Sequence, residues 1–167
     1  MDESVAADPL PNLHDDAPWD REMDLGPFGL GARSLTPGTT KLGATLYEVH
    51  PGKATLPYHA HHAMDEVIVG VRGTATVRTP RGDVQLGEGD VLCCPAGDDG
   101  AHQVRNDTDH AVRVMIFSNR PEVDAIEYPD SRKLQVGVGT WGTDSFRRWI
   151  LDTTATREYM DGELDEA

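Results

Sequence analysis

The chain contains very few cysteines and no long apolar segment. Only two of its 167 residues are cysteine, and these two, Cys93 and Cys94, are adjacent. Neighbouring side chains on a strand point to opposite faces, so these two cannot bridge each other. No apolar run is long enough to span a bilayer, and the acidic N-terminus lacks the basic and then apolar segments of a secretory signal. We therefore expect a reduced, cytoplasmic protein without membrane contact.

Basic residues are scarce as well. The chain has 15 basic and 29 acidic residues, and its formal net charge is −14. Such a charge argues against nucleic acid or an anionic membrane as a partner. Aspartate outnumbers glutamate 19 to 10, and only 3 of the basic residues are lysine. This acidic composition is typical of a salt-adapted, halophilic surface, and equally of the codon bias of a GC-rich genome, so both explanations stay open.

Aromatic residues are the third scarce class. They make up 6% of the chain, and all hydrophobic residues 38%, which predicts a core of valine, leucine, isoleucine and alanine. A chain of this length forms one ordinary domain. Residues 1–25 are polar and predict a flexible acidic N-terminal arm, which Trp19 and Phe28 would attach to the domain or to a partner subunit. The single domain is expected over residues 26–167, with a barrel core at about 42–119.

Short strands with regular spacing dominate the middle of the chain. They are predicted at residues 42–49, 65–72, 74–79, 83–86, 90–94, 102–105 and 111–118, and turn-forming residues such as glycine and proline separate them. This pattern indicates an all-β sandwich or barrel. Beyond Arg120 the pattern weakens, and residues 146–151 and 154–160 are each predicted as a short helix or an edge strand.

Four residues have the spacing of a metal site. His59 and His61 lie two residues apart, which places both imidazoles on one face of an extended strand. Glu66 follows, and His102 lies on a separate predicted strand, so the four side chains can converge. Three imidazoles and one carboxylate suit Fe, Mn, Ni, Co, Cu or Zn, and differ from the all-oxygen cage of Ca or Mg. His62 is expected to face away from this group.

The same residues resemble the two motifs of the cupin superfamily. The motif G-x5-H-x-H-x(3,4)-E-x6-G is matched by Gly52, His59, His61, Glu66 and Gly73. The motif G-x5-P-x-G-x2-H-x3-N is matched by Gly89, Pro95, Gly97, His102 and Asn106. There are two departures: six residues rather than five follow Gly52, and four rather than two follow Gly97. Both fall in predicted turns and remove no ligand.

A narrower resemblance extends over nearly the whole chain. Segments at residues 42–49, 51–53, 57–63, 96–103, 127–131 and 158–163 are similar to small bacterial and archaeal single-domain cupins of the conserved-barrel group. The resemblance implies a cupin barrel, that is, a double-stranded β-helix or jelly roll, with a metal site. It also implies a homodimer, in which the arm from Trp19 to Phe28 could be exchanged between subunits. It does not imply a particular reaction.

The metal ligands His59, His61, Glu66 and His102 leave one or two coordination positions for water, oxygen or substrate, as in catalytic sites. We therefore expect one divalent transition metal (Fe, Mn, Ni or Zn) and a small-molecule ligand. The favoured function is a metal-dependent enzyme, a dioxygenase or isomerase of a small carboxylate, enol or sugar-like compound. The alternative is a non-catalytic, metal-dependent binding or sensor protein. A cysteine could add a soft ligand, or serve as a small buried side chain.

Overall fold

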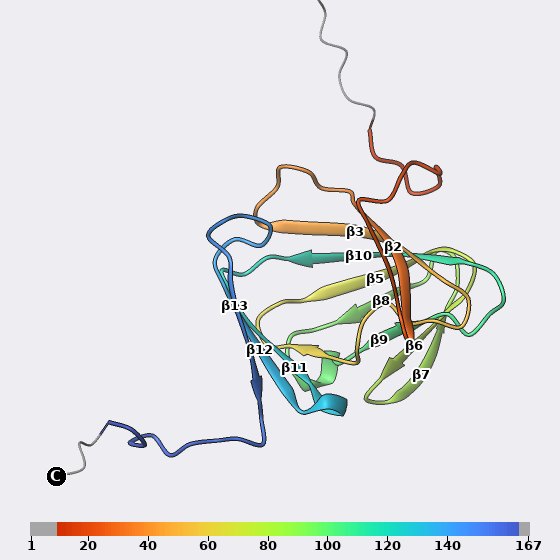
Figure 1. Cartoon of the computed structure of the whole chain (residues 1–167). Helices are drawn as coiled ribbons and strands as arrows, with labels where there is room; N and C mark the ends of the chain where they lie inside the picture. The colour runs from red at the N-terminus through yellow and green to blue at the C-terminus, as the bar shows by residue number, and fades with distance from the viewer. Residues whose placement is uncertain (1–9, 164–167) are drawn as a thin grey trace, which may run out of the picture.

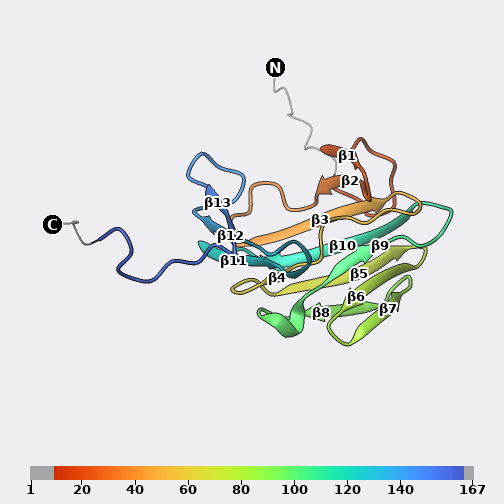
Figure 2. The same cartoon turned by 60° about the horizontal axis from the view of Figure 1, so that its bottom comes forward.

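The computed structural model describes residues 10–163 and is built almost entirely of antiparallel strands (Figures 1 and 2). The strands are β1 (Arg21–Leu25), β2 (Phe28–Ser34), β3 (Leu42–Val49), β4 (Ala60–His61), β5 (Glu66–Arg72), β6 (Ala75–Thr79), β7 (Gly82–Leu86), β8 (Val91–Cys94), β9 (Gln103–Arg105), β10 (Val112–Asn119), β11 (Val123–Tyr128), β12 (Lys133–Val138) and β13 (Arg147–Asp152). Two 3-10 helices, η1 (Asp98–Gly100) and η2 (Pro129–Ser131), complete these elements. No helix within residues 10–163 is long and apolar enough to cross a membrane.

The strands form three sheets. Their orders are β1-β2-β3-β10-β5-β8, β7-β6-β9 and β13-β12-β11-β4. Strands far apart in sequence pair with each other, as β3 does with β10 and β6 with β9, which is the connectivity of a jelly roll rather than of simple hairpins. Figure 2 shows β3, β10 and β5 side by side, with β6 and β7 on one side and β11 to β13 toward the other end. The predicted all-β barrel is confirmed.

Small aliphatic side chains fill the interior of the barrel. Ile68, Val49 and Val77 are completely buried, and Tyr47 and Ile116 pack against the same cluster. The cluster consists of Val49, Ile68, Ala75, Val77, Leu86, Cys94, Val104, Val112 and Val114. The composition of this core agrees with the scarcity of aromatic residues in the sequence. It also places Cys94 inside and Cys93 outside, as their adjacency on a strand predicts.

The strand predictions are confirmed in the middle of the chain and incomplete outside it. The strand predicted at residues 42–49 is β3, and the other six differ from β5 to β10 by one residue at one or both ends. Residues 146–151 form an edge strand, β13, rather than a helix. The prediction for residues 154–160 was wrong, because they form turns. There, Asp152 accepts hydrogen bonds from the backbone N–H and the hydroxyl of Thr154, which favours a turn over regular structure.

The predicted N-terminal arm is partly incorporated into the barrel. Residues 1–9 lie outside the described residues, but residues 21–25 form β1, which pairs with β2. Trp19 packs on Gly31, where an added Cβ would lie 2.6 Å from the indole ring. The guanidinium groups of Arg33 and Arg113 lie 5.3 and 5.4 Å from the centre of this ring. Residues 19–25 are therefore fixed against the sheet rather than flexible.

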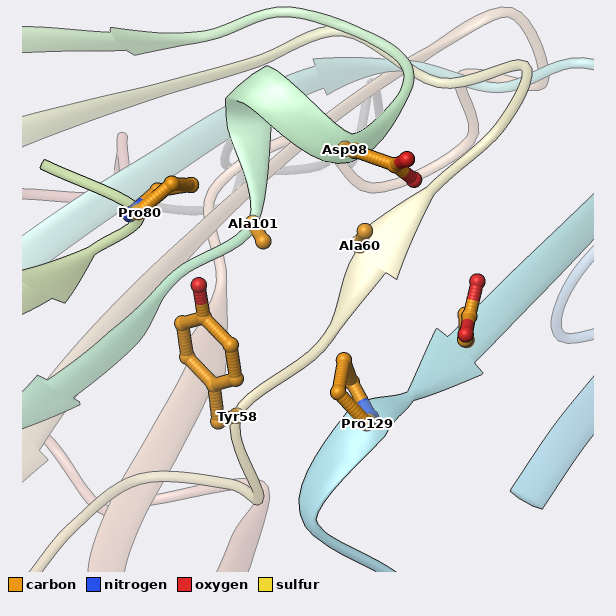
Figure 3. A pocket seen from close by; sticks show the side chains of 7 residues that line it. Tyr58, Ala60, Pro80, Asp98, Ala101 and Pro129 are labelled. Atoms are coloured by element: carbon orange, nitrogen blue, oxygen red, sulfur yellow. The ribbon is translucent and has the colours of Figure 1, made fainter. Parts of the chain in front are cut away.

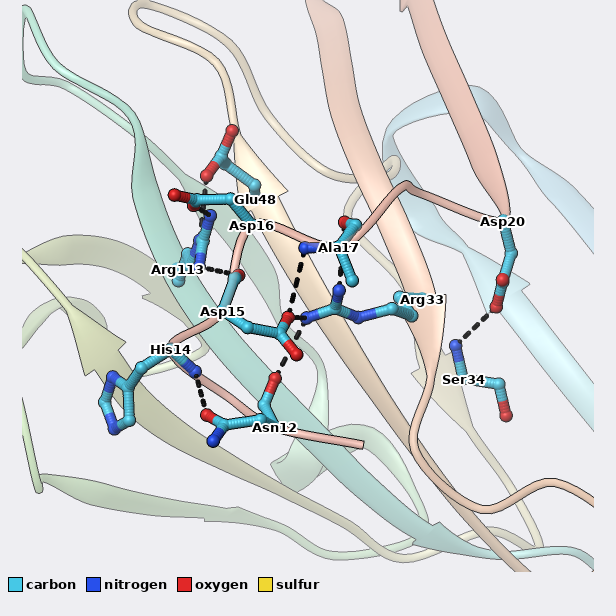
Figure 4. Close-up of polar contacts among 10 residues, drawn as sticks. All are labelled: Asn12, His14, Asp15, Asp16, Ala17, Asp20, Arg33, Ser34, Glu48 and Arg113. Atoms are coloured by element: carbon cyan, nitrogen blue, oxygen red, sulfur yellow. Dashed lines mark hydrogen bonds and ion pairs between the residues drawn. The ribbon is translucent and has the colours of Figure 1, made fainter. Parts of the chain in front are cut away.

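Two buried arginines hold the segment before Trp19 (Figure 4). Arg33 donates hydrogen bonds to the carbonyl oxygens of Asn12 and Ala17, each 2.9 Å long. Arg113 donates to the carbonyl of Asp15 at 2.8 Å and to the carboxylate of Asp16 at 2.9 Å. A buried guanidinium needs acceptors for its donors, and the acidic segment supplies them for the terminal nitrogens, whereas the buried Nε of Arg33 has no partner. The acidic residues of this segment thus have a structural role.

Asn106 links two turns of the barrel through its side-chain amide, which has no charged partner. Its side chain is fully buried and makes four hydrogen bonds. The amide donates to the carbonyl oxygens of Val49 at 2.9 Å and His110 at 2.7 Å. Its oxygen accepts from the backbone N–H of Thr108 at 2.9 Å and from the Thr108 hydroxyl at 2.7 Å. All donor and acceptor positions of the amide are therefore used.

We expect Asn106→Ala to lower the free energy of unfolding by roughly 2–3 kcal/mol, because it leaves buried carbonyl and N–H groups without partners. The measurement is urea unfolding followed by circular dichroism. Asn119→Ala is the matched control, since the Asn119 side chain accepts one exposed hydrogen bond, from the backbone N–H of Asp65. Equal losses in both variants would contradict this interpretation of Asn106.

Candidate metal centre

Backbone pairing brings the four predicted ligands to one place. The N–H of His59 donates to the carbonyl of His102 at 3.1 Å, and the N–H of His102 donates back to His59 at 2.8 Å. His61 lies in β4 and pairs with Ile126 of β11. Glu66 begins β5. The four side chains thus reach the same interior space from segments that are separate in sequence.

The distances between the side chains are those of a compact cluster. Donor atoms of His59, His61 and Glu66 all lie within 4.8 Å of one another. The carboxylate oxygen Oε2 of Glu66 lies 3.1 Å from Nε2 of His102 and 3.6 Å from Nε2 of His61. The ring of His59 lies 5.0 Å from that of His61 and 4.7 Å from that of His102, centre to centre. The structure therefore brings His59, His61 and Glu66 into one group of possible donors, and His102 lies beside Glu66 and His59 at the margin of that group.

Each of the three imidazoles has its Nδ1 atom occupied. Nδ1 of His59 donates to the carbonyl of Pro57 and Nδ1 of His102 to the carbonyl of Gly100, both at 2.9 Å. Nδ1 of His61 lies 2.5 Å from a carboxylate oxygen of Asp124. A carbonyl oxygen only accepts hydrogen bonds, so in His59 and His102 Nδ1 must carry hydrogen. In the neutral rings the lone pair is then on Nε2.

Asp124 is the supporting residue that sequence reasoning missed. It is buried, and its second oxygen accepts the backbone N–H of Ala63 at 2.9 Å, which fixes the carboxylate beside His61. A carboxylate on the outer nitrogen of a ligating histidine orients the ring and increases its basicity. The alternation of residues 123–128 could have indicated the strand that carries Asp124, but nothing local in the sequence connects it with a histidine 63 residues away.

Burial and neighbouring charges separate the protonation behaviour of the histidines. Burial lowers the pKa of His59 to about 4, and the neighbouring His102 and His61 contribute in the same direction. Burial also lowers the pKa of His102, but hydrogen bonds to Cys94 and Glu66 outweigh it and raise that pKa to about 10. Burial raises the pKa of Glu66, yet the neighbouring histidines lower it below its usual value overall. Glu66 is therefore a carboxylate at neutral pH.

A divalent transition metal fits this donor set. Donor atoms of His59, His61 and Glu66 lie close together, and Nε2 of His102 lies 3.1 Å from Glu66. The hydrogen bonds on Nδ1 favour the tautomer that a metal requires in His59 and His102. Cys94 lies opposite Glu66 on β8 and beside His102, and it is buried in the hydrophobic cluster of the barrel. Its position agrees with the small buried side chain that was one of its two predicted roles.

Loop geometry explains why the motif departures do not displace the site. The backbone N–H of Gly97 donates to the carbonyl of His61 at 2.7 Å, and Gly97 has a φ of 97°, which favours glycine. The residues that follow form η1, which ends at Gly100, where an added Cβ would lie 1.8 Å from the carbonyl oxygen of Pro95. The two extra residues thus form a helical turn, and His102 still pairs with His59.

The inner face of the four-stranded sheet extends the site toward solvent. Antiparallel pairing places Ile126 beside both His61 and Gln135, so these side chains share one face. The ring of Tyr128 stacks on that of His59 with centres 6.0 Å apart, and the ammonium of Lys133 lies 5.2 Å from the centre of Tyr128. The wall beside the metal ligands is therefore polar and carries a cation.

The outer face of β4 carries a separate group. His62 points away from the four ligands, as predicted, and its Nε2 lies 3.4 Å from a carboxylate oxygen of Glu127, with Asp98 close by. A pocket of about 340 Å³ opens on this face, with Tyr58 and Ala60 among its lining residues (Figure 3). None of the four ligands lines this pocket, so it is distinct from the candidate metal centre.

Comparisons with known proteins agree with this architecture. A family model for the cupin domain matches residues 45–118, the segment that contains all four ligands. A candidate sugar phosphate isomerase from Acidithiobacillus ferrooxidans is 22% identical with a TM-score of 0.68, and the match covers 78% of this chain and 80% of that one. A cupin-superfamily sugar phosphate isomerase from Silicibacter pomeroyi is 22% identical with a TM-score of 0.64, covering 78% and 82%.

The comparison with curated proteins gives no match. At 22% identity, the likeness to the two solved structures shows a shared fold and leaves the reaction open. The matched family model, the jelly-roll pairing of the strands and these structural relatives agree with one another. Residues 45–118 thus match the cupin domain, and the chain has the fold of a cupin barrel.

Proposed function

We propose that the protein is a metal-dependent cupin enzyme that isomerises a small anionic, sugar-like substrate. The observation that supports this proposal is the close group of His59, His61 and Glu66, with His102 beside Glu66 and with Nδ1 of all three histidines already hydrogen bonded. Isomerisation is favoured over oxygenation because two structural relatives are described as sugar phosphate isomerases. The proposed ligands are His59, His61, Glu66 and His102.

The metal would be one divalent ion, Fe, Mn, Ni or Zn, held by these four side chains. Such an ion supplies Lewis acidity toward a substrate carbonyl or hydroxyl. Asp124 keeps the ring of His61 oriented. Tyr128 stacks on His59 and limits the space on that side.

Lys133 is the residue we assign to substrate recognition. It is one of only three lysines in a chain with a net charge of −14, and its ammonium lies over Tyr128, on the site-facing side of the sheet. A cation in an otherwise acidic protein attracts an anionic group such as a phosphate or carboxylate to this side of the site. Gln135 is buried on the same face and supplies a neutral hydrogen-bonding group.

A non-catalytic binding protein is the second candidate. The observation that favours it is the protonation of Tyr128. Burial raises the pKa of this tyrosine, and the charge of Arg148 only partly opposes the effect. Its hydroxyl therefore stays protonated at neutral pH and cannot act as a base there. The homodimer, the cytoplasmic location and the halophilic surface belong to the same proposal as further expectations.

We expect Asp124→Asn to weaken metal binding by on the order of tenfold to a hundredfold while leaving the barrel folded, because His61 loses its carboxylate partner. The double variant His59→Ala/His102→Ala should hold no stoichiometric metal. Elemental analysis after reconstitution and gel filtration measures both. Asp107→Asn, which changes an exposed carboxylate paired with Arg105, is the control. Full metal occupancy in the double variant would reject the ligand assignment.

Metal affinity should rise with pH across the neutral range. The pKa of about 10 means that the imidazole of His102 is protonated on both nitrogens below that pH in the metal-free protein. Because Nδ1 keeps its hydrogen to donate to Gly100, the proton that titrates is the one on Nε2. A metal must displace it, so affinity should rise about tenfold per pH unit while one proton is released. His59, with a pKa of about 4, adds competition only in acid. Chelator competition at pH 6, 7 and 8 tests this; an affinity independent of pH would contradict it.

The reaction can be tested on protein loaded separately with Fe(II), Mn, Ni and Zn. Aldose and ketose phosphates are incubated in deuterated water, with the unphosphorylated sugars as controls, and products are followed by NMR. We expect interconversion of the phosphates, and a rise in KM of at least tenfold in Lys133→Met with unchanged metal content. The opposite result is a ligand that stabilises the protein by about 2.7 kcal/mol at a hundredfold excess over Kd and is recovered unchanged. That result would reject the enzyme proposal and favour a binding protein.

A further inference from the structure

Strand β13 is an exposed edge, and no segment within residues 10–163 covers its apolar side chains. It is the last strand of the sheet β13-β12-β11-β4, and Figure 1 shows it in blue at the outer side of β12. All six of its residues are exposed. Trp149, Ile150 and Leu151 are 48%, 53% and 50% exposed. An edge strand has unpaired N–H and C=O groups along one side, and charges or proline usually protect such an edge when its middle is apolar.

The order of residues in β13 is complementary to itself. The strand reads Arg-Arg-Trp-Ile-Leu-Asp, with positive charge at its start and negative charge at its end. Two copies paired antiparallel would therefore bring opposite charges together. Among residues 10–163, neither Arg147 nor Arg148 makes an ion pair within the chain, so both remain available.

Resting on the homodimer of the proposed function, we propose that its interface is β13, which pairs antiparallel with β13 of a second copy in a register centred on Ile150. Opposed residues in an antiparallel pair share a face of the sheet, so the two-fold axis must relate residues of equal parity. Centring on Ile150 places Ile150 opposite Ile150, Trp149 opposite Leu151 and Arg148 opposite Asp152. The two sheets then join into one sheet of eight strands.

The neighbouring registers are worse on both charge and packing. Centring on Trp149 places Arg148 opposite Ile150 and Arg147 opposite Leu151, so the cations face apolar side chains. Centring on Leu151 places Ile150 opposite Asp152. Only the Ile150 register pairs each apolar residue with another and each opposed charge with its opposite.

The surface beside β13 fits a second copy. Trp149 of one copy would lie opposite Leu151 of the other, on the face that carries Leu134. A pocket of about 520 Å³ opens at the end of β13, and residues of both faces line it, among them Leu134 and Leu151 on one face and Ile150 and Asp152 on the other. Arg148 and Asp152 lie on the opposite face, which is the face that also carries Asp124 and leads to the metal ligands. The dimer would thus hold the wall of the candidate metal centre in place.

A pair of charge-reversal variants tests the proposal in solution. Sedimentation should give the wild type a mass of twice the 18.2 kDa chain at micromolar concentration. Arg148→Asp and Asp152→Arg each place like charges opposite each other twice, and each alone should raise the dimer Kd by roughly tenfold or more. An equimolar mixture of the two variants restores both attractive pairs and should dimerise as the wild type does. Arg147→Asp is the control, because it faces Thr153 in this register.

The register is tested by cross-linking in a Cys93→Ser background, which removes the exposed thiol. Oxidised Ile150→Cys should form a covalent dimer, since the two thiols lie directly opposite, whereas Trp149→Cys should not. A monomeric wild type, a mixture that dimerises no better than its components, or cross-linking through position 149 but not 150 would each overturn the proposal.

Discussion

The candidate metal centre depends on hydrogen bonds at Nδ1 of three histidines, and the rest of the barrel positions the acceptors of these bonds. Carbonyl oxygens of Pro57 and Gly100 and the carboxylate of Asp124 occupy the Nδ1 atoms. Nε2 of His61 and Nε2 of His102 then lie 3.6 and 3.1 Å from the Glu66 carboxylate. An imidazole that is free to rotate or to change tautomer would present either nitrogen, so the metal preference of the site rests on these bonds.

The fold supplies those acceptors from distant parts of the chain. The carbonyl of Gly100 comes from η1, whose position is fixed by the bond from Gly97 to the carbonyl of His61. Asp124 comes from β11, which pairs with β4. The aliphatic core holds β5 and β8 together and keeps Glu66 beside Cys94. The polar centre is therefore built at the edge of the hydrophobic cluster, where partners from three segments satisfy each buried polar atom.

Local patterns were sufficient to predict the barrel strands and the grouping of His59, His61 and Glu66. The spacing of His59 and His61 has a period of two, and one strand fixes which face both occupy, with His62 on the other face. The remaining features depend on contacts that no local pattern contains. Asp124 meets His61 across 63 residues, and the acidic segment at residues 12–16 is ordered by Arg33 and Arg113. Residues 154–160 form turns because side chains such as Asp152 compete for the backbone.

The central claim is that a divalent metal is bound by nitrogen and oxygen and not by sulfur. X-ray absorption of the protein loaded with Zn measures this directly. The account predicts three imidazole nitrogens and carboxylate or water oxygen at about 2.0–2.2 Å, with no sulfur scatterer. A sulfur shell at about 2.3 Å would show that Cys94 is a ligand, and would contradict the assignment of the site to His59, His61, Glu66 and His102.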